Sequence, residues 1–203
     1  MSEIVPGTAL GAGLNPLQAQ AVYRAVLDAF ARPGTIRLLP RTAYPSALLS
    51  AMSLADLETG THLLEAPGEE WTSVLATATG APQTSLRDAK YVTALRPLTD
   101  DELGEVSVGT PLSPESGATV IIAVDSVRGG DAVRLTGPGV PQPIEFAPHG
   151  ISTGIWEARE RLVSAFPTGV DLLFVGRDGD LVGIPRTTVV DTLVHTTPTA
   201  KAN

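Results

Sequence analysis

The chain has 203 residues, 43% of them hydrophobic, and its 22 acidic and 14 basic side chains give a formal net charge of −8. This length favours one domain with a sizeable core, and the absence of any basic run argues against a nucleic-acid partner. Cysteine is absent, which excludes disulfides, a thiolate nucleophile and cysteine-based metal sites.

Residues Met1 to Asn15 lack the basic and apolar segments of a signal peptide, and no run approaches the ~18 apolar residues of a membrane span. We therefore expect a cytoplasmic protein with no membrane partner. The histidines His62, His149 and His195 have no partners at helical spacing, so the sequence predicts no helix-borne metal pair.

The ends of the chain differ in pattern from its body. Residues 1–14 are rich in glycine and alanine without periodicity and predict a flexible arm, and the polar residues 196–203 predict a flexible tail. Residues 15–195 alternate helical and β-type segments, which predicts one α/β domain.

Helices are predicted where apolar residues recur at helical spacing after a start signal. Asn15-Pro16 supplies an N-cap and a proline at the first helical position. Ser46 is the predicted cap of a second helix, and Ser152 or Thr153 that of the last one. The expected helices cover residues 15–32, 46–60, 69–79 and 151–165, with a short one from Thr99.

The centre of the sheet is expected between Gly109 and Gly139. Residues 118–124 form a continuous β-branched run, which is typical of a strand buried on both faces. The glycines of the link 128–131 favour a tight reversal into a second strand over residues 132–136. We therefore predict a hairpin of these two strands.

A second hairpin is predicted near the C-terminus, where the Asp-Gly signal of residues 177–180 joins strands over 170–175 and 181–184. Together with the helices, the strands predict a three-layer α/β/α sandwich with a mixed sheet. Further short strands are expected over residues 35–39, 61–66, 91–95 and 144–147.

Asp171 is the most unusual acid in the chain, because it stands at the head of an otherwise apolar strand. Burying a carboxylate is costly unless it is paired. The predicted C-terminal hairpin brings the region of Asp171 close to that of Arg186. Two interpretations stay open: a structural ion pair at the strand end, which we favour, and part of a ligand site.

Four further side chains are candidates for binding or chemistry. Arg24 and Arg134, like Arg186, could bind an anion because a guanidinium group matches phosphate oxygens, although Arg24 could equally lie on a solvated helix face. Glu115 could cap the turn that follows it or coordinate a ligand. Only two lysines occur, one of them in the predicted tail, so a Schiff-base cofactor would depend on Lys90.

Five segments, in order along most of the chain, carry a family resemblance. They are Tyr23-Arg24 with residues 31–36, residues 109–110 with 114–119, residues 133–139, residues 166–172 and residues 184–188. Together they resemble the PhnH family, a subunit of the bacterial carbon–phosphorus lyase machinery of phosphonate breakdown. Phe30 and Ala31 depart from the expected Met and Ser, which is a conservative change in packing.

The resemblance implies a fold similar to the large domain of pyridoxal-phosphate-dependent transferases, without the cofactor. It implies a homodimer when isolated, and a complex with the PhnG, PhnI and PhnJ subunits. It also implies support of ATP-dependent phosphonate ribosylation, in which a phosphonate displaces adenine to give ribose 1-phosphonate 5-triphosphate. A separate radical subunit then cleaves the carbon–phosphorus bond. The resemblance assigns no catalytic residue to this chain.

We therefore predict an accessory subunit of the carbon–phosphorus lyase complex that has no complete active site of its own and no cofactor. The alternative is a stand-alone enzyme that binds a nucleotide or a phosphonate through Arg24, Arg134 or Arg186. A third interpretation is a pyridoxal-phosphate enzyme that uses Lys90.

Overall fold

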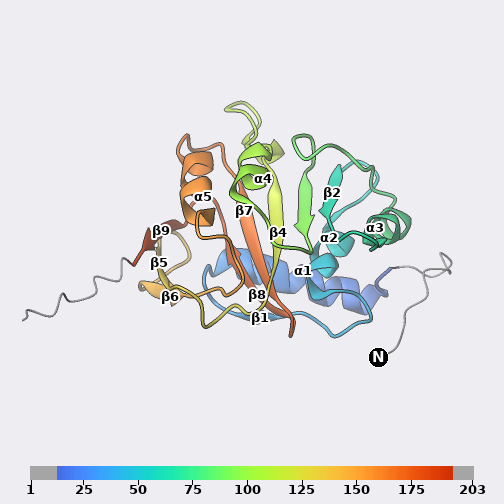
Figure 1. The fold of residues 1–203 in the computed structure, drawn as a ribbon, viewed down its shortest axis with the longest axis horizontal. Helices are drawn as coiled ribbons and strands as arrows, with labels where there is room; N and C mark the ends of the chain where they lie inside the picture. The colour runs from blue at the N-terminus through green and yellow to red at the C-terminus, as the bar shows by residue number, and fades with distance from the viewer. Residues whose placement is uncertain (1–12, 194–203) are drawn as a thin grey trace, which may run out of the picture.

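The computed structural model describes residues 13–193, so most of the predicted arm 1–14 and all of the predicted tail 196–203 lie outside the described residues. The described chain is a mixed α/β fold with a six-stranded and a three-stranded sheet (Figure 1). Its helices are α1 (Pro16–Ala31), α2 (Ser46–Leu54), α3 (Trp71–Thr79), α4 (Asp100–Glu105) and α5 (Ile155–Val163), with a 3-10 turn, η1 (Pro114–Ser116).

The six-stranded sheet is mixed, as predicted. Its strands are β1 (Arg37–Leu38), β2 (Thr61–Leu64), β3 (Tyr91–Ala94), β4 (Thr119–Val124), β7 (Asp171–Gly176) and β8 (Asp180–Ile184). They lie in the order β1-β8-β7-β4-β3-β2. The strands β2, β3, β4 and β7 run parallel, whereas β8 pairs antiparallel with both β7 and β1. The predicted hairpin of β7 and β8 is therefore confirmed.

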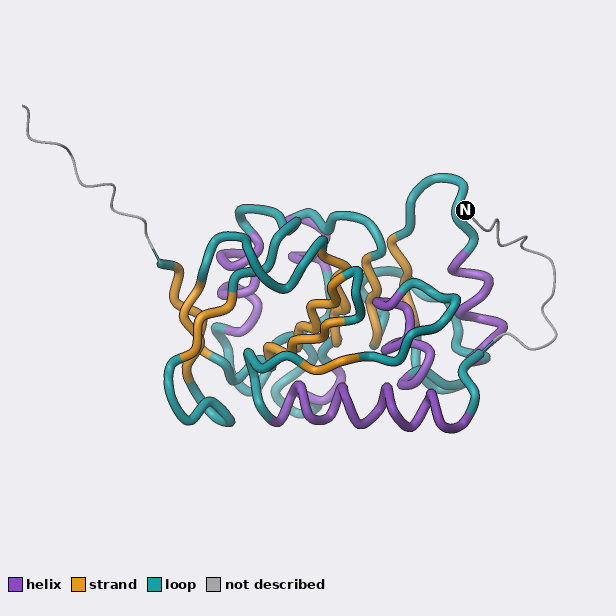
Figure 2. The backbone as a smooth tube through the Cα atoms, turned by 90° about the horizontal axis from the view of Figure 1, so that it is seen from below, coloured by secondary structure: helices purple, strands orange, loops and turns teal. Residues whose placement is uncertain are grey.

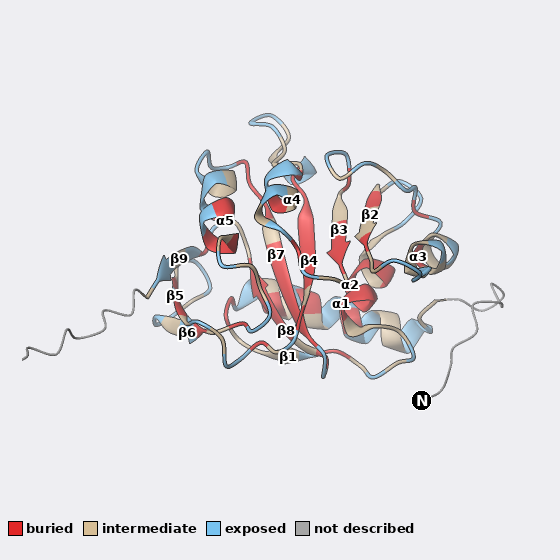
Figure 3. Cartoon of the chain, viewed as in Figure 1, coloured by how far each residue is buried: buried red, intermediate tan, exposed pale blue. Residues whose placement is uncertain are grey.

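The central strands β4 and β7 are buried on both faces, as the apolar run of residues 118–124 predicted (Figure 3). Successive side chains of a strand point to opposite faces. In β4, Ile122 belongs to the apolar cluster that includes α4 and α5, whereas Ile121 belongs to the cluster that includes α1, α2 and α3. Phe174 and Leu173 repeat this alternation in β7. Helices thus cover both faces of the sheet, with α1 lying along one of them (Figure 2).

The predicted hairpin of residues 118–124 and 132–136 is wrong. β4 pairs with β3 and β7, and both neighbours run parallel to it. The second strand, β5 (Val133–Thr136), belongs to the three-stranded sheet, where it lies between β6 (Ile144–Phe146) and β9 (Val189–Thr192). The brief edge strand predicted over 144–147 is confirmed, and β9 was not predicted.

Gly130, between β4 and β5, allows two backbones to approach each other closely. The main-chain N–H groups of Asp125 and Gly130 donate to the carbonyl oxygens of His149 and Ala147. A Cβ atom at Gly130 would lie 2.0 Å from the Pro148 carbonyl oxygen. These contacts lead the chain away from the large sheet, which is why the glycine pair does not close a hairpin.

The helix starts are only partly as predicted. Asn15 caps α1, and its side chain accepts a hydrogen bond from the Gln18 N–H at 2.9 Å. The predicted serine caps are wrong: Ser46 is the first residue of α2 rather than its cap, and the cap position of α5 is Gly154. No helix within residues 13–193 has the length and apolar character that crossing a bilayer requires.

Gly183 in β8 provides a test of how α1 packs on the sheet. A Cβ atom there would lie 2.7 Å from both the carbonyl carbon and the carbonyl oxygen of Ala29. We expect Gly183→Ala to displace α1 and to lower the free energy of unfolding by about 1–3 kcal/mol.

The matched control is Gly104 in α4, where an added Cβ atom would have no atom within 4 Å. Gly104→Ala should raise the free energy of unfolding by about 0.5–1 kcal/mol, because alanine favours the helix. Urea unfolding measures both variants. A Gly183→Ala protein as stable as the Gly104→Ala protein would contradict the close contact between α1 and β8.

Candidate functional site

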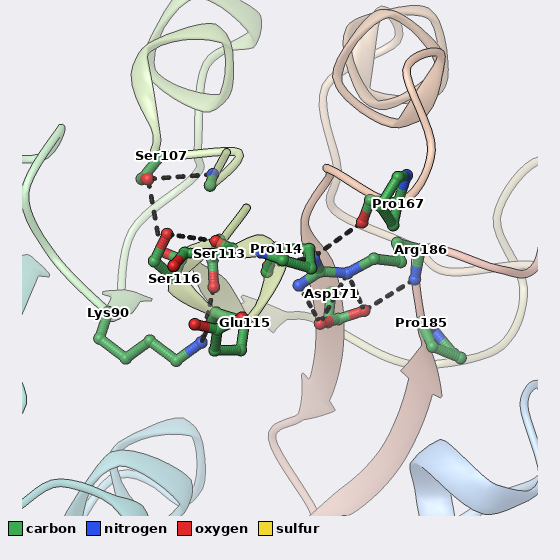
Figure 4. Close-up of polar contacts among 12 residues, drawn as sticks. Lys90, Ser107, Ser113, Pro114, Glu115, Ser116, Pro167, Asp171, Pro185 and Arg186 are labelled. Carbon is green, nitrogen blue, oxygen red and sulfur yellow. Dashed lines mark hydrogen bonds and ion pairs between the residues drawn. The ribbon is translucent and has the colours of Figure 1, made fainter. Parts of the chain in front are cut away.

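Asp171 begins β7 at the amino edge of the large sheet, where several loops meet (Figure 4). In the parallel register it lies beside Thr119, the first residue of β4, and Thr119 lies beside Tyr91, the first residue of β3. The antiparallel strand β8 ends at the same edge, immediately before Pro185 and Arg186. The order and direction of the strands therefore gather residues that are distant in sequence.

Arg186 forms the predicted ion pair with Asp171. Its Nη2 atom lies 2.7 Å from Oδ2, its Nε atom lies 3.3 Å from each carboxylate oxygen, and its main-chain N–H donates to Oδ1 at 2.8 Å. The two side chains are only 13% and 22% exposed. Several hydrogen bonds thus compensate a largely buried carboxylate, which agrees with the structural interpretation of the pair.

The Arg186 guanidinium also joins two loops to the sheet. Its Nη1 atom donates to the carbonyl oxygens of Pro114, at 2.7 Å, and Pro167, at 3.4 Å. With the bonds to Asp171, four of the five N–H groups of the side chain have protein acceptors. This arrangement leaves little capacity to hold an external phosphate in a bidentate manner.

Lys90 stabilises the loop before β4. Its Nζ atom donates to the carbonyl oxygens of Glu115 and, at 2.7 Å, Gly117. Burial lowers the pKa of the Lys90 ammonium group, the charge of Arg186 lowers it further, and the charge of Asp171 raises it. The lysine that would have to carry a Schiff base is therefore occupied as a hydrogen-bond donor to main-chain carbonyls.

Arg159 in α5 is a third cation near Asp171, and the sequence did not reveal it. The side chain is 3% exposed, and its Nη2 atom donates to the carbonyl oxygens of Pro185, at 2.8 Å, and Thr188, at 2.9 Å. Desolvation lowers its pKa to about 10, and the charge of Asp171 opposes that shift. A signal existed, because residue 159 follows the buried Ile155 by four positions and so shares its helix face.

Asp171 and these three cations are called the Asp171 cluster below. Each cation donates to two main-chain carbonyl oxygens, and together these carbonyls belong to the loop before β4, the loop before β7 and the loop after β8. The carboxylate supplies the negative charge among them, bonding directly to Arg186. The cluster is thus suited to fixing loop positions.

The other predicted site residues lie elsewhere or point outward. Arg24 is exposed on α1, and Arg134 is exposed on β5, directly opposite Glu145 of β6 and Asp191 of β9. Glu115 lies in η1 beside the cluster, where its carbonyl oxygen, rather than its exposed carboxylate, makes the contact with Lys90. The structure therefore brings together two of the five predicted residues as a side-chain pair.

The opposite, carboxyl edge of the sheet carries a cavity of about 250 Å³ that the sequence analysis missed. Ligands of open α/β sheets commonly bind outside the carboxyl ends of the strands. Arg177, directly after β7, lines the cavity together with Ser46 and Trp71 at the starts of α2 and α3. None of the predicted site residues lines it. Recognising β7 as a parallel strand would have pointed to Arg177.

Arg177 is already partly engaged at this edge, because its Nη2 atom lies 2.5 Å from Oδ1 of Asp125, the residue after β4. The start of α3 is capped by Glu65, which accepts a hydrogen bond from the Trp71 N–H at 2.7 Å. Within residues 13–193, no group of three or more histidine, aspartate or glutamate side chains is placed to hold a metal ion.

The segments that carry the family resemblance meet in space. Those around residues 114, 167 and 186 surround the Asp171 cluster. The remaining two pack on each other, because a Cβ atom at Gly139 would lie 2.6 Å from the Ala31 carbonyl oxygen. Gly137 links these two to the segment after β8, where the Thr187 carbonyl oxygen would lie 2.9 Å from its Cβ atom. Several of the residues that carry the resemblance therefore lie where loops contact one another.

Comparison with known proteins identifies the family of the chain. The family described as "Bacterial phosphonate metabolism protein (PhnH)" matches residues 13–191, and the chain belongs to this family. It is 30% identical over 196 residues to "Alpha-D-ribose 1-methylphosphonate 5-triphosphate synthase subunit PhnH" of Rhizobium meliloti (strain 1021), covering 89% of this chain and 94% of the relative. It is 29% identical to "Putative C-P lyase subunit protein HtxG" of Stutzerimonas stutzeri, with 85% of each chain covered.

The two relatives are both named as subunits, one of a ribose 1-methylphosphonate 5-triphosphate synthase and the other of a C-P lyase. The resemblance seen in the five sequence segments is therefore confirmed at the level of the family. The chain is similar to proteins that work as parts of a phosphonate-metabolising complex.

We expect the ion pairs at the two edges of the sheet to contribute very differently to the free energy of unfolding. Arg186→Met leaves a largely buried carboxylate unpaired and should lower the free energy of unfolding by roughly 3 kcal/mol. Arg177→Met removes a pair whose side chains are 80% and 44% exposed, so its cost should stay below about 1 kcal/mol. Urea unfolding of both variants measures the difference without the ionic screening of a guanidinium salt. A loss below about 1 kcal/mol for Arg186→Met would show that Arg186 is not a structural anchor.

Proposed function

We propose that this chain is an accessory subunit of the carbon–phosphorus lyase complex. In this role it supports ATP-dependent phosphonate ribosylation, in which adenine is displaced to give ribose 1-phosphonate 5-triphosphate, and its partners are the PhnG, PhnI and PhnJ subunits. Family membership and the names of the two relatives support the proposal that this chain belongs to the complex. The cytoplasm, which supplies ATP, is the compartment that this reaction requires.

The single observation that favours an accessory role is the state of the Asp171 cluster. All three cations of the cluster bind main-chain carbonyl oxygens, and Arg186 has only one N–H group without a protein acceptor. A catalytic or anion-binding arginine keeps donors directed at the substrate. These side chains instead donate to loop carbonyl oxygens and hold the loops in place, which suits a subunit that presents a surface to its partners.

Two finer features belong to the same proposal. We propose that the isolated chain is a homodimer and that its fold is similar to the large domain of pyridoxal-phosphate-dependent transferases. The mixed sheet with helices on both faces is compatible with that relation. Both features come from the family resemblance rather than from a particular contact.

A second candidate function is ligand binding at the carboxyl edge of the sheet. The cavity lined by Arg177, Ser46 and Trp71 favours it, because parallel strands usually place ligands at this edge. The stand-alone nucleotide- or phosphonate-binding enzyme would then use Arg177, in place of the predicted Arg24, Arg134 or Arg186.

Co-expression with the PhnG, PhnI and PhnJ subunits of the same genome tests the accessory role. A tag on PhnI should retain this chain through size-exclusion chromatography in a fixed ratio to the other subunits. The purified chain alone should show no turnover of ATP with methylphosphonate. Turnover by the chain alone, or its complete absence from the purified assembly, would contradict the proposal.

Calorimetric titration of the purified chain with ATP and with methylphosphonate separates the two candidates. A purely accessory subunit should release no heat of binding with either compound. Heat that disappears in Arg177→Met but persists in Arg134→Met would favour the carboxyl-edge cavity as a ligand site. Arg134 serves as the control because it is an exposed arginine on the separate three-stranded sheet.

A further inference from the structure

The loop between α4 and β4 presents an apolar side chain to solvent. Leu112 is 96% exposed, more than any other large hydrophobic residue within residues 13–193. Thr110 and Ser113 exchange main-chain hydrogen bonds of 3.2 and 3.0 Å, so Pro111 and Leu112 form the tip of a tight turn. A leucine displayed in this way buries almost no apolar area in the fold of its own chain and so contributes little to its stability.

The same loop is held in place by the Asp171 cluster. Arg186 binds the Pro114 carbonyl oxygen and Lys90 binds that of Gly117, close to the base of the turn. Gly109 closes the base from the other side, since its Cβ atom would lie 2.8 Å from the Gly117 nitrogen. A loop that is already ordered loses little conformational entropy when a partner binds it.

A second apolar residue belongs to the same surface. Phe166 is 68% exposed, and Arg186 binds the carbonyl oxygen of the next residue, Pro167. The two loops touch directly, because the Gly169 N–H donates to the Val108 carbonyl oxygen at 2.8 Å. We call the surface formed by Pro111, Leu112, Phe166 and Pro167 the amino-edge face.

The charges around the amino-edge face are mainly acidic. Glu105 at the end of α4, Glu115 in η1 and Glu160 in α5 are exposed, as is Arg161 in α5. Arg87 and Asp88, exposed before β3 at the same edge, add one charge of each sign. Two copies of this face brought together about a two-fold axis would place like charges against each other. The charges therefore favour a different chain, with basic side chains around an apolar recess.

We propose that the amino-edge face is the surface through which this chain docks onto another subunit of its complex. That subunit offers an apolar recess for Leu112 and a basic rim. The inference rests on the proposed function, and it adds the location of the contact and the chemistry of the partner. The Asp171 cluster then acts as the support that positions both apolar loops for docking.

A pair of matched substitutions tests the proposal in the co-expressed complex. Leu112→Asp should weaken association with the other subunits by about tenfold or more, because it places a charge at the centre of the contact. Leu57→Asp is the control, since Leu57 is 77% exposed in the turn after α2 and lies outside the amino-edge face. It should leave association unchanged, and both variants should melt at the wild-type temperature.

The outcomes separate the inference from the proposed function. If the wild-type chain assembles and Leu112→Asp assembles equally well, the amino-edge face is not the docking surface and the inference fails alone. If Leu112→Asp changes only the self-association of the isolated chain, the face is a contact between copies and the inference is again overturned. If the wild-type chain does not assemble, the proposed function fails and the inference fails with it.

Discussion

The interaction on which this structure depends is between one carboxylate, Asp171, and the cations that surround it. The carboxylate bonds to Arg186, and its charge opposes the pKa shifts that burial imposes on Lys90 and Arg159. Without that charge, the repulsion between Arg186 and Lys90 would be unopposed by Asp171, and Arg159 would lose the charge that opposes its desolvation. With it, each cation can donate to main-chain carbonyl oxygens and fix a loop. The ordering of the loops is therefore an electrostatic consequence of one residue at the head of β7.

This arrangement gives the two edges of the sheet different chemical characters. At the amino edge, the cations of the Asp171 cluster are directed inward at the protein's own carbonyls, and the apolar side chains of Leu112 and Phe166 are displayed to solvent. At the carboxyl edge, Arg177 lies beside an open cavity. The first edge is suited to a protein partner and the second to a small ligand. A subunit that brings components together can use both edges without interference.

The sequence predicted contacts between residues that are close along the chain and missed contacts between segments that are far apart along it. The pair of Asp171 and Arg186 was predictable because a short Asp-Gly hairpin, β7 to β8, connects the two residues. Arg159 was missed although it shares a helix face with Ile155, because its partners are carbonyl oxygens of a loop that is distant in sequence. The hairpin after β4 was wrong because Gly130 accommodates a backbone approach that local sequence does not reveal. The cavity at Arg177 required the parallel order of β3, β4 and β7, which only the assembled sheet supplies.

Hydrogen exchange of the wild-type chain and of Asp171→Asn tests most directly whether one carboxylate orders the loops. We expect the main-chain N–H groups of Gly117 and Gly169, which bond to the carbonyl oxygens of Pro114 and Val108, to exchange markedly faster in the variant. Amides of β2, at the far edge of the sheet, should keep their wild-type rates. Unchanged exchange at Gly117 and Gly169, or an equal acceleration throughout the sheet, would contradict the account.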